Sequence, residues 1–215
     1  MSMTPQEAST RIEAICEMAP VISVLVVEDV AQAVPLARAL IAGGLPVLEV
    51  TLRTEAALDV IAAMAGVEGG VVGAGTLLSA DDVARARDAG ASFGVSPGAT
   101  DALLDACEAA GLPLLPGAST ASEAMALQAR GYTVQKFFPA GPAGGVNFLR
   151  ALGGPLPSIR FCPTGGVNQI NAAEYLELAN VLCVGGSWVA PRPKLESGDW
   201  DGVRALAMMA RRLAD

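Results

Sequence analysis

Residues 46–52 read Pro-Val-Leu-Glu-Val-Thr-Leu, a short β-branched run that is apolar on both faces apart from one carboxylate and one hydroxyl. The segment before it, Val30–Ala42, repeats its apolar residues every three or four positions and ends at Gly43-Gly44. This spacing predicts a helix, and the short run predicts a buried parallel strand. Together they indicate one helix–strand unit.

The same alternation repeats along the whole chain. Besides Val47–Val50, the runs predicted as strands are Val21–Val26, Val71–Ala74, Ser92–Val95, Leu112–Leu115, Thr133–Phe137, Ser158–Cys162 and Val181–Val184. Eight strands joined by helices favour a (β/α)8 TIM barrel, with an extra N-terminal helix over Pro5–Met18. No linker or low-complexity segment interrupts the pattern, so a single domain is expected over residues 1–215.

A doubly wound open sheet is the alternative fold. Its phosphate-binding signatures are missing, since Gly73-Ala-Gly75 lacks the third glycine of GxGxxG and no GxxxxGK[ST] occurs.

The sequence also predicts where several helices start. Pro35 predicts that the helix of Val30–Ala42 begins late or kinks, and Thr120 and Glu123 have capping-box spacing. Residues expected as N-caps are Thr54, Ser79, Thr100, Ser119 and Asn168.

Composition narrows the class of protein. With 22 acidic and 14 basic residues the formal net charge is −8, so neither nucleic acid nor an anionic membrane is expected as a partner. Residues 1–13 lack a signal-peptide pattern, and the longest apolar stretch, Ala19–Val27, is too short to span a bilayer. The four cysteines form no CxxC motif, which favours free thiols and a cytoplasmic location.

The chain contains no histidine and only two lysines, Lys136 and Lys194. The absence of histidine excludes Ser-His triads and removes the commonest metal ligand, which disfavours a metal-dependent mechanism. Any catalysis must use lysine, arginine, carboxylates, hydroxyls or the backbone.

Lys136 ends a predicted strand, and the carboxyl ends of barrel strands carry the active site. If Val134 and Phe138 face the interior, Lys136 faces it too, and desolvation there would lower its pKa from about 10.4 towards neutrality. A neutral amine can attack a ketone and form an imine. The alternative is a lysine whose ammonium group extends into water.

Glu49 is a carboxylate in an apolar strand, which is costly without a partner or a role. It is the best candidate general acid/base in a chain without histidine, although a structural ion pair with Lys136 or Arg53 is also possible. Arg53 and Thr76 could hold a carboxylate. Gly165-Gly166 and Gly185-Gly186-Ser187, the glycine loops, follow the seventh and eighth strands, where barrels commonly bind phosphate.

The sequence resembles the 2-keto-3-deoxy-6-phosphogluconate (KDPG) and 4-hydroxy-2-oxoglutarate (KHG) aldolase family. The resembling segments run in order along nearly the whole chain: residues 47–54 (VLEVTLRT), 72–76 (VGAGT), 96–98 (SPG), 136–140 (KFFPA), 160–166 (RFCPTGG) and 183–188 (CVGGSW).

By this resemblance the protein is a metal-free class I lyase of the Entner–Doudoroff pathway, a cytoplasmic homotrimer that releases pyruvate from a phosphorylated keto acid. Lys136 would be the Schiff-base lysine and Glu49 the proton shuttle. The resemblance also implies a set of substrate-binding residues: Arg53 and Thr76 at the pyruvyl carboxylate, Pro97 and Phe138 shaping the pocket, Thr164 near the substrate, and Gly165, Gly166, Gly185 and Ser187 at the phosphate.

Ser23, Gln135 and Gly141 depart from the family pattern, and Ser23 and Gln135 leave the fine substrate preference open. The alternatives within the family are KHG or the galactonate epimer of the sugar acid as substrate. A class II aldolase or metal-dependent epimerase is disfavoured by the missing histidines. A non-catalytic barrel that binds phosphate ligands is the remaining alternative.

Overall fold

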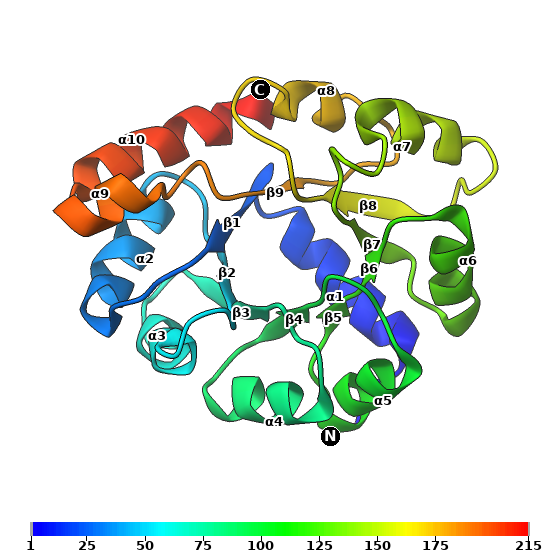
Figure 1. Ribbon diagram of the computed structural model, residues 1–215, viewed down its shortest axis with the longest axis horizontal. Coiled ribbons are helices and arrows are strands. Elements are labelled where there is room, and N and C mark those ends of the chain that lie inside the picture. Colours follow the sequence, from blue (N-terminus) through cyan, green and yellow to red (C-terminus); the bar gives the residue numbers. More distant parts are fainter. Residues whose placement is uncertain (1, 215) are drawn as a thin grey trace.

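The protein folds around a curled parallel β-sheet that is surrounded by helices (Figure 1). This computed structural model describes residues 2–214; Met1 and Asp215, the two ends of the predicted domain, lie outside the described residues. The strands are β1 Val21–Leu25, β2 Val47–Thr51, β3 Val71–Gly75, β4 Phe93–Val95, β5 Leu114–Leu115, β6 Gly117–Ala118, β7 Val134–Phe137, β8 Arg160–Pro163 and β9 Val184–Gly186.

Helices follow most of the strands and lie on the outer face of the sheet (Figure 1). The α-helices are α1 Pro5–Cys16, α2 Ala33–Ala42, α3 Ala57–Ala65, α4 Ala80–Asp88, α5 Asp101–Ala110, α6 Ala121–Arg130, α7 Gly145–Gly153, α8 Ala172–Leu176, α9 Arg192–Ser197 and α10 Trp200–Arg211. Two 3-10 turns are η1 Val30–Gln32 and η2 Arg212–Ala214. The predicted extra N-terminal helix is confirmed as α1.

All strand pairs in the sheet are parallel. Six strands run in the order β5-β4-β3-β2-β1-β9, so the first strand pairs with the last, and three more run β6-β7-β8. Two isolated parallel bridges, Phe161–Val181 and Thr164–Gly185, join the β8 and β9 segments. The fifth predicted run differs from expectation. Pro116, which has no N–H to donate, separates β5, which pairs with β4, from β6, which pairs with β7.

The helix starts agree with the expected caps in part. Ser79 and Thr100 cap α4 and α5, and Thr120 forms a capping box with Glu123 at the start of α6. Ser119, Thr54 and Asn168 were expected as N-caps and are not. Ser119 precedes the true cap, Thr54 donates to the carbonyl of Val27, and Asn168 accepts from two loop amides, Ile170 and Asn171. Helix α2 begins late, at Ala33, which leaves Pro35 in its first turn, where no amide hydrogen bond is lost.

Two apolar clusters hold the fold together. The larger lies between the sheet and the outer helices, and the smaller lies on the concave face of the sheet, where α1 packs across the amino-terminal ends of the strands (Figure 1). The buried members of the smaller cluster are Ile12, Cys16, Ile22, Val47, Phe93, Val95, Leu115, Val134, Cys162 and Cys183.

The concave face continues towards the carboxyl ends of the strands. Side chains two residues apart in a strand share a face. Glu49 therefore follows Val47, Lys136 follows Val134, and Thr164 follows Cys162 on the concave face. The inner cluster fills one end of this space and leaves polar groups at the other.

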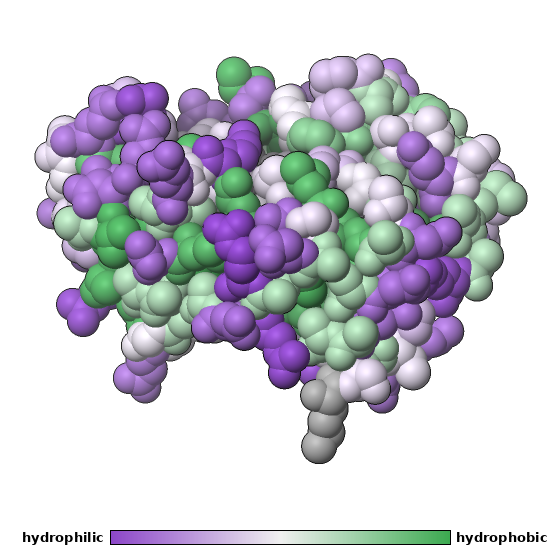
Figure 2. All heavy atoms as spheres, turned by 60° about the horizontal axis from the view of Figure 1, so that its bottom comes forward, coloured by the Kyte–Doolittle hydropathy of each residue, from purple (hydrophilic) through white to green (hydrophobic). Residues whose placement is uncertain are grey.

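All four cysteines are buried free thiols, as expected. Burial raises the pKa of Cys107 to about 12, and the pKa of Cys183 is raised by hydrogen bonds with Cys16 and Cys162 and by desolvation. Among the described residues, no helix is both long and apolar enough to cross a membrane. Figure 2, in which the bottom of Figure 1 is turned forward, shows hydrophilic and hydrophobic side chains interspersed over that face.

Candidate active site

Lys136 and Glu49 meet on the concave face of the sheet. The Lys136 Nζ donates a hydrogen bond to Glu49 Oε1 at 3.2 Å, and the two residues are only 5% and 2% exposed. They come from β7 and β2, 87 positions apart in the chain. A buried charge is tolerated where an opposite charge and a hydrogen bond compensate it, and each of these residues supplies both to the other. Lys136 thus lies in the interior on the same face as Val134, and of the two ion-pair partners considered for Glu49 it is Lys136 that forms the contact.

The neighbours of this pair give it room and shape. A Cβ on Gly75 would overlap the Glu49 carboxylate, so β3 must carry glycine where β2 carries the acid. The Phe138 ring lies with its centroid 5.2 Å from Lys136 Nζ, within range of a cation–π contact. The peptide bond from Phe138 to Pro139 is cis.

Arg53 and Thr76 lie just beyond the carboxyl ends of the adjacent strands β2 and β3. Arg53 is exposed in the turn that follows β2 and forms no ion pair with the described residues. Thr76 is half-buried and has φ +64°, the left-handed region that a β-branched residue rarely adopts. Strain of this kind gathers at functional sites, which makes Thr76 a functional candidate on geometric grounds.

Pro97 and Thr164, two more of the expected site residues, lie at the same end of the sheet. Pro97 is half-buried after β4, and its carbonyl leaves no space for a side chain at Gly117. Thr164 is buried after β8, next to Gly185, where a Cβ would overlap Thr164 Oγ1. An amine, a carboxylate and a hydroxyl therefore share the concave face.

Of the two predicted glycine loops, Gly165-Gly166 does follow β8, whereas Gly185 and Gly186 are the last two residues of β9, paired with β1, and only Ser187 lies beyond that strand. Gly165 and Gly166 have φ +91° and +82°, a conformation that explains why both positions carry glycine. Ser187 is exposed directly after β9 and lines a cavity of about 340 Å³, whose wall also contains Val24, Trp188 and Arg192. Val24 pairs in register with Glu49, so this cavity lies beside the strand that carries the acid.

Two of the departures from the family pattern do not face this site. The Gln135 Nε2 donates to the carbonyls of Ala124 and Tyr132, so its side chain points out of the sheet towards α6. Ser23 is adjacent to Ile22 of the inner cluster and therefore points to the opposite face. Strand alternation therefore turns both side chains away from the Lys136–Glu49 pair.

Sequence reasoning missed Gly75 and Gly117 as parts of the site. Their contribution is the absence of a side chain, which admits Glu49 in one case and the Pro97 backbone in the other. For Gly75 the only signal in the sequence was the Gly-Ala-Gly-Thr stretch at residues 73–76, which does not say what the glycine must accommodate, and for Gly117 there was none.

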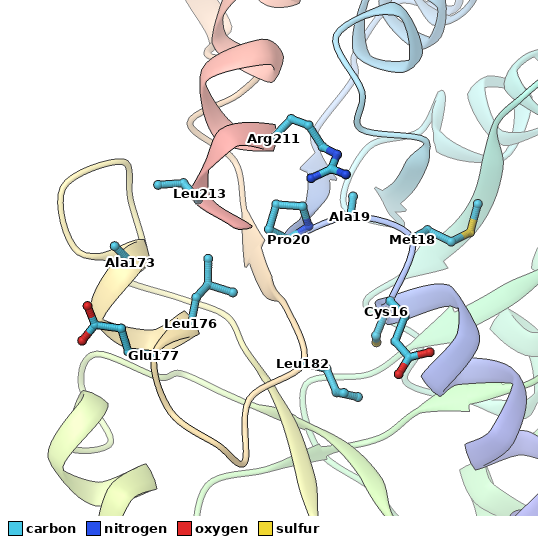
Figure 3. Close-up of a pocket in the computed structure, with 11 residues that line it drawn as sticks. Cys16, Met18, Ala19, Pro20, Ala173, Leu176, Glu177, Leu182, Arg211 and Leu213 are labelled. Carbon is cyan, nitrogen blue, oxygen red and sulfur yellow. The ribbon is translucent and has the colours of Figure 1, made fainter. Parts of the chain in front are cut away.

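A second cavity, of about 460 Å³, opens at the opposite, amino-terminal ends of the strands (Figure 3). Its wall includes Cys16, Pro20, Leu182 and Arg211, and the described residues that line it include none of the predicted site residues. In residues 2–214 no group of three or more histidine, cysteine, aspartate or glutamate side chains is arranged to hold a metal ion. The amine–carboxylate pair is thus the centre of the candidate site.

Comparison with known proteins finds the same family along most of the chain. The family model for KDPG and KHG aldolase matches residues 12–206. A 2-dehydro-3-deoxy-phosphogluconate aldolase of Pseudoalteromonas atlantica is 56% identical over 89% of each chain.

Two solved structures are similar throughout. The 2-keto-3-deoxy-6-phosphogluconate aldolase of Zymomonas mobilis, solved with 3-phosphoglycerate, gives a TM-score of 0.91 at 45% identity over 95% of this chain and 97% of that one. The KDPG aldolase of Legionella pneumophila, with pyruvate captured as a covalent carbinolamine intermediate, gives 0.90 at 42% identity over 93% and 97%.

Proposed function

Because the chain belongs to the KDPG and KHG aldolase family, we propose that it is a class I aldolase of the Entner–Doudoroff pathway. It cleaves 2-dehydro-3-deoxy-6-phosphogluconate to pyruvate and glyceraldehyde 3-phosphate. The observation that carries this proposal is the buried contact between Lys136 Nζ and Glu49 Oε1. An amine held against a carboxylate is what imine formation on a ketone requires.

The reaction starts with proton transfer. Glu49 accepts a proton from Lys136, and the neutral Nζ attacks the C2 carbonyl carbon to form a carbinolamine. Protonation of the C2 hydroxyl lets it leave as water, and the protonated imine remains on Lys136. The covalent pyruvate adduct in the Legionella relative supports this route.

Carbon–carbon cleavage uses the same pair. Glu49 removes the proton of the C4 hydroxyl, the C3–C4 bond breaks, and its electron pair moves into the protonated imine to give an enamine. The phosphorylated aldehyde leaves. Protonation at C3 and hydrolysis then release pyruvate and restore Lys136. No metal or other cofactor takes part in this scheme.

The remaining polar groups hold the two charged ends of the substrate. Arg53 and Thr76 bind the carboxylate, since a guanidinium and a hydroxyl are both suitable donors. Pro97, Phe138 and Thr164 form the wall around the keto carbon. The backbone of Gly165, Gly166 and Gly185, together with the Ser187 hydroxyl, binds the phosphate. This is supported by the left-handed glycines and by the position of both loops at strand ends.

We also propose that the curled sheet is a closed (β/α)8 barrel in a homotrimer. Closure is supported by the β1–β9 pairing and the two bridges between β8 and β9. The trimer itself rests on membership of the family. Light scattering of the purified protein measures the mass directly, and a monomer would refute the trimer.

A cytoplasmic location without nucleic-acid or membrane partners fits the net charge of −8.

KHG is the second candidate substrate, because the matching family model covers both activities. The comparison of turnover on the phosphorylated and unphosphorylated substrates decides between them. A galactonate epimer is distinguished by assaying the two C4 epimers separately.

The decisive experiment is borohydride reduction in the presence of pyruvate, followed by peptide mass spectrometry. We expect a pyruvyl adduct on the peptide that contains Lys136. An adduct on Lys194, which pairs with Asp199 on the surface at 2.5 Å, would keep the chemistry but move the site. No adduct on either lysine of a folded sample would favour a barrel that binds phosphate ligands without cleaving them.

A further inference from the structure

Three consecutive backbone carbonyl groups after β8 accept hydrogen bonds from residues outside their loop. The Thr164 oxygen accepts from the Ala140 amide at 2.8 Å, and the Gly165 oxygen accepts from the Gly141 amide at 2.8 Å. The Gly166 oxygen accepts from the Asn171 side-chain Nδ2 at 3.0 Å. All three donors lie outside the loop.

A hydrogen bond that fixes a carbonyl group also fixes the direction of the N–H group in the same peptide unit. A trans peptide is planar, so its N–H points opposite to its C=O. The N–H groups of Gly165, Gly166 and Val167 therefore point away from the three donors. We call these groups the amide row. Within residues 2–214 the N–H groups of Gly166 and Val167 donate to no other protein group, whereas the Gly165 N–H lies at the parallel bridge between Thr164 and Gly185. A row of unpaired N–H groups in a left-handed turn is a concavity suited to an anion.

Asn171 is the one side chain among the three donors, and its amide is fixed at both ends. Its Oδ1 accepts from the Asn168 amide at 2.8 Å while its Nδ2 donates to Gly166. The side chain makes no capping hydrogen bond at the start of α8, although Asn171 stands at the N-cap position. A residue type that favours caps is therefore committed to the loop instead.

We infer that Asn171 is a positioning residue for phosphate recognition: it sets the orientation of the amide row towards a phosphomonoester. This inference rests on the proposed function, because it assigns the phosphate of the substrate to the glycine loops. Asn171 does not touch the reacting atoms. Its removal frees the Gly166 carbonyl, and the last peptide unit of the row can then rotate away from the ligand.

A positioning role predicts a pattern that general destabilisation does not. Asn171→Asp keeps the acceptor for Asn168 but replaces the donor to Gly166 with an oxygen. We expect KM for the phosphorylated substrate to rise about threefold to tenfold, the range for one lost hydrogen bond. Turnover number and the KM for unphosphorylated KHG should stay within about twofold, since no interaction made in the transition state is lost.

The experiment compares Asn171→Asp and Asn171→Ala with Asn147→Asp. The control adds the same charge at an exposed asparagine of α7 that bonds only to Arg150 among the described residues. Steady-state kinetics on both substrates is combined with calorimetry of inorganic phosphate binding, which needs no turnover. Weaker phosphate binding in both Asn171 variants, with the control unchanged, supports the inference.

Two results would overturn it. One is an equal loss on both substrates, which would make Asn171 a structural residue. The other is unchanged phosphate affinity in both variants with normal melting temperatures. Borohydride trapping of pyruvate by the wild-type protein runs alongside. If trapping fails while phosphate binding still depends on Asn171, the aldolase proposal falls and the positioning role stands.

Discussion

The Lys136–Glu49 pair and the glycine loops lie at the same end of the sheet but are built differently. The pair consists of two buried side chains fixed by strands β7 and β2, and each compensates the charge of the other. The loop of Gly165 and Gly166 offers backbone amides, whose direction depends on the left-handed conformation of both glycines and on donors from other segments. Side-chain chemistry is therefore rigidly fixed by the sheet, whereas backbone recognition depends on contacts around the loop.

The largest expected effect follows from removing Lys136, the proposed nucleophile. Lys136→Ala should abolish cleavage and borohydride trapping, because Lys194, the other lysine among residues 2–214, pairs with Asp199 on the surface. Activity assays and circular dichroism measure the two consequences, with Lys194→Ala as the matched control. If the folded variant keeps most of its activity, the nucleophile is elsewhere.

Glu49→Gln tests the other half of the pair. It keeps the shape but removes the proton acceptor, so kcat should fall by about 10²- to 10⁴-fold, the usual contribution of a general acid/base. The assay is steady-state kinetics. A change confined to KM would instead make Glu49 a binding residue and blur the distinction between the two regions.

Gly75→Ala tests how tightly the pair is fixed. The added methyl overlaps the Glu49 carboxylate, and a displacement of about 1 Å can lower turnover about 10²-fold. Gly98→Ala is the control, since a Cβ there meets no atom within 4 Å. Equal turnover numbers for the two variants would show that the pair tolerates movement.

Gly166→Ala tests the loops in the same way. An alanine at φ +82° costs roughly 1–2 kcal/mol, so the loop should relax and KM for the phosphorylated substrate should rise. Turnover of the unphosphorylated substrate should be retained, in contrast to Gly75→Ala. Gly154→Ala, with no neighbour within 4 Å, is the control. A matching loss on both substrates would mean that the loop and the pair are not separable.

The smallest effect concerns a feature outside both regions. A hydrogen bond from the Ser119 amide, with further bonds from Thr120 and Ser119, holds the pKa of Glu123 below its ordinary value. The contribution of ionised Glu123 to the free energy of unfolding is therefore fully present above the ordinary glutamate pKa of about 4.3. It is lost as the pH falls through the lower pKa of the folded state. Glu123→Gln should cost only roughly 0.5 kcal/mol by urea unfolding at pH 7, because solvent screens this exposed carboxylate at the helix start, and activity should be normal. A loss of activity would link this cap to the Lys136–Glu49 pair.

The sequence by itself determined which elements form and which side chains are candidates for catalysis. Strand and helix periodicity placed the eight predicted runs within a few residues of the observed strands, and the scarcity of lysine with the lack of histidine singled out Lys136 and Glu49. Their roles in catalysis stay predictions. These features are local, because side-chain burial and charge follow from the pattern of neighbouring residues.

Only the tertiary structure decided what distant segments do to one another. It brought Glu49 within hydrogen-bond distance of Lys136, turned Gln135 out towards α6, and made Gly75 the space that the acid needs. It also linked Asn171 to the loop of Gly166. The physical reason is that steric exclusion and amide direction belong to pairs of segments packed together, and no single stretch of sequence contains both partners.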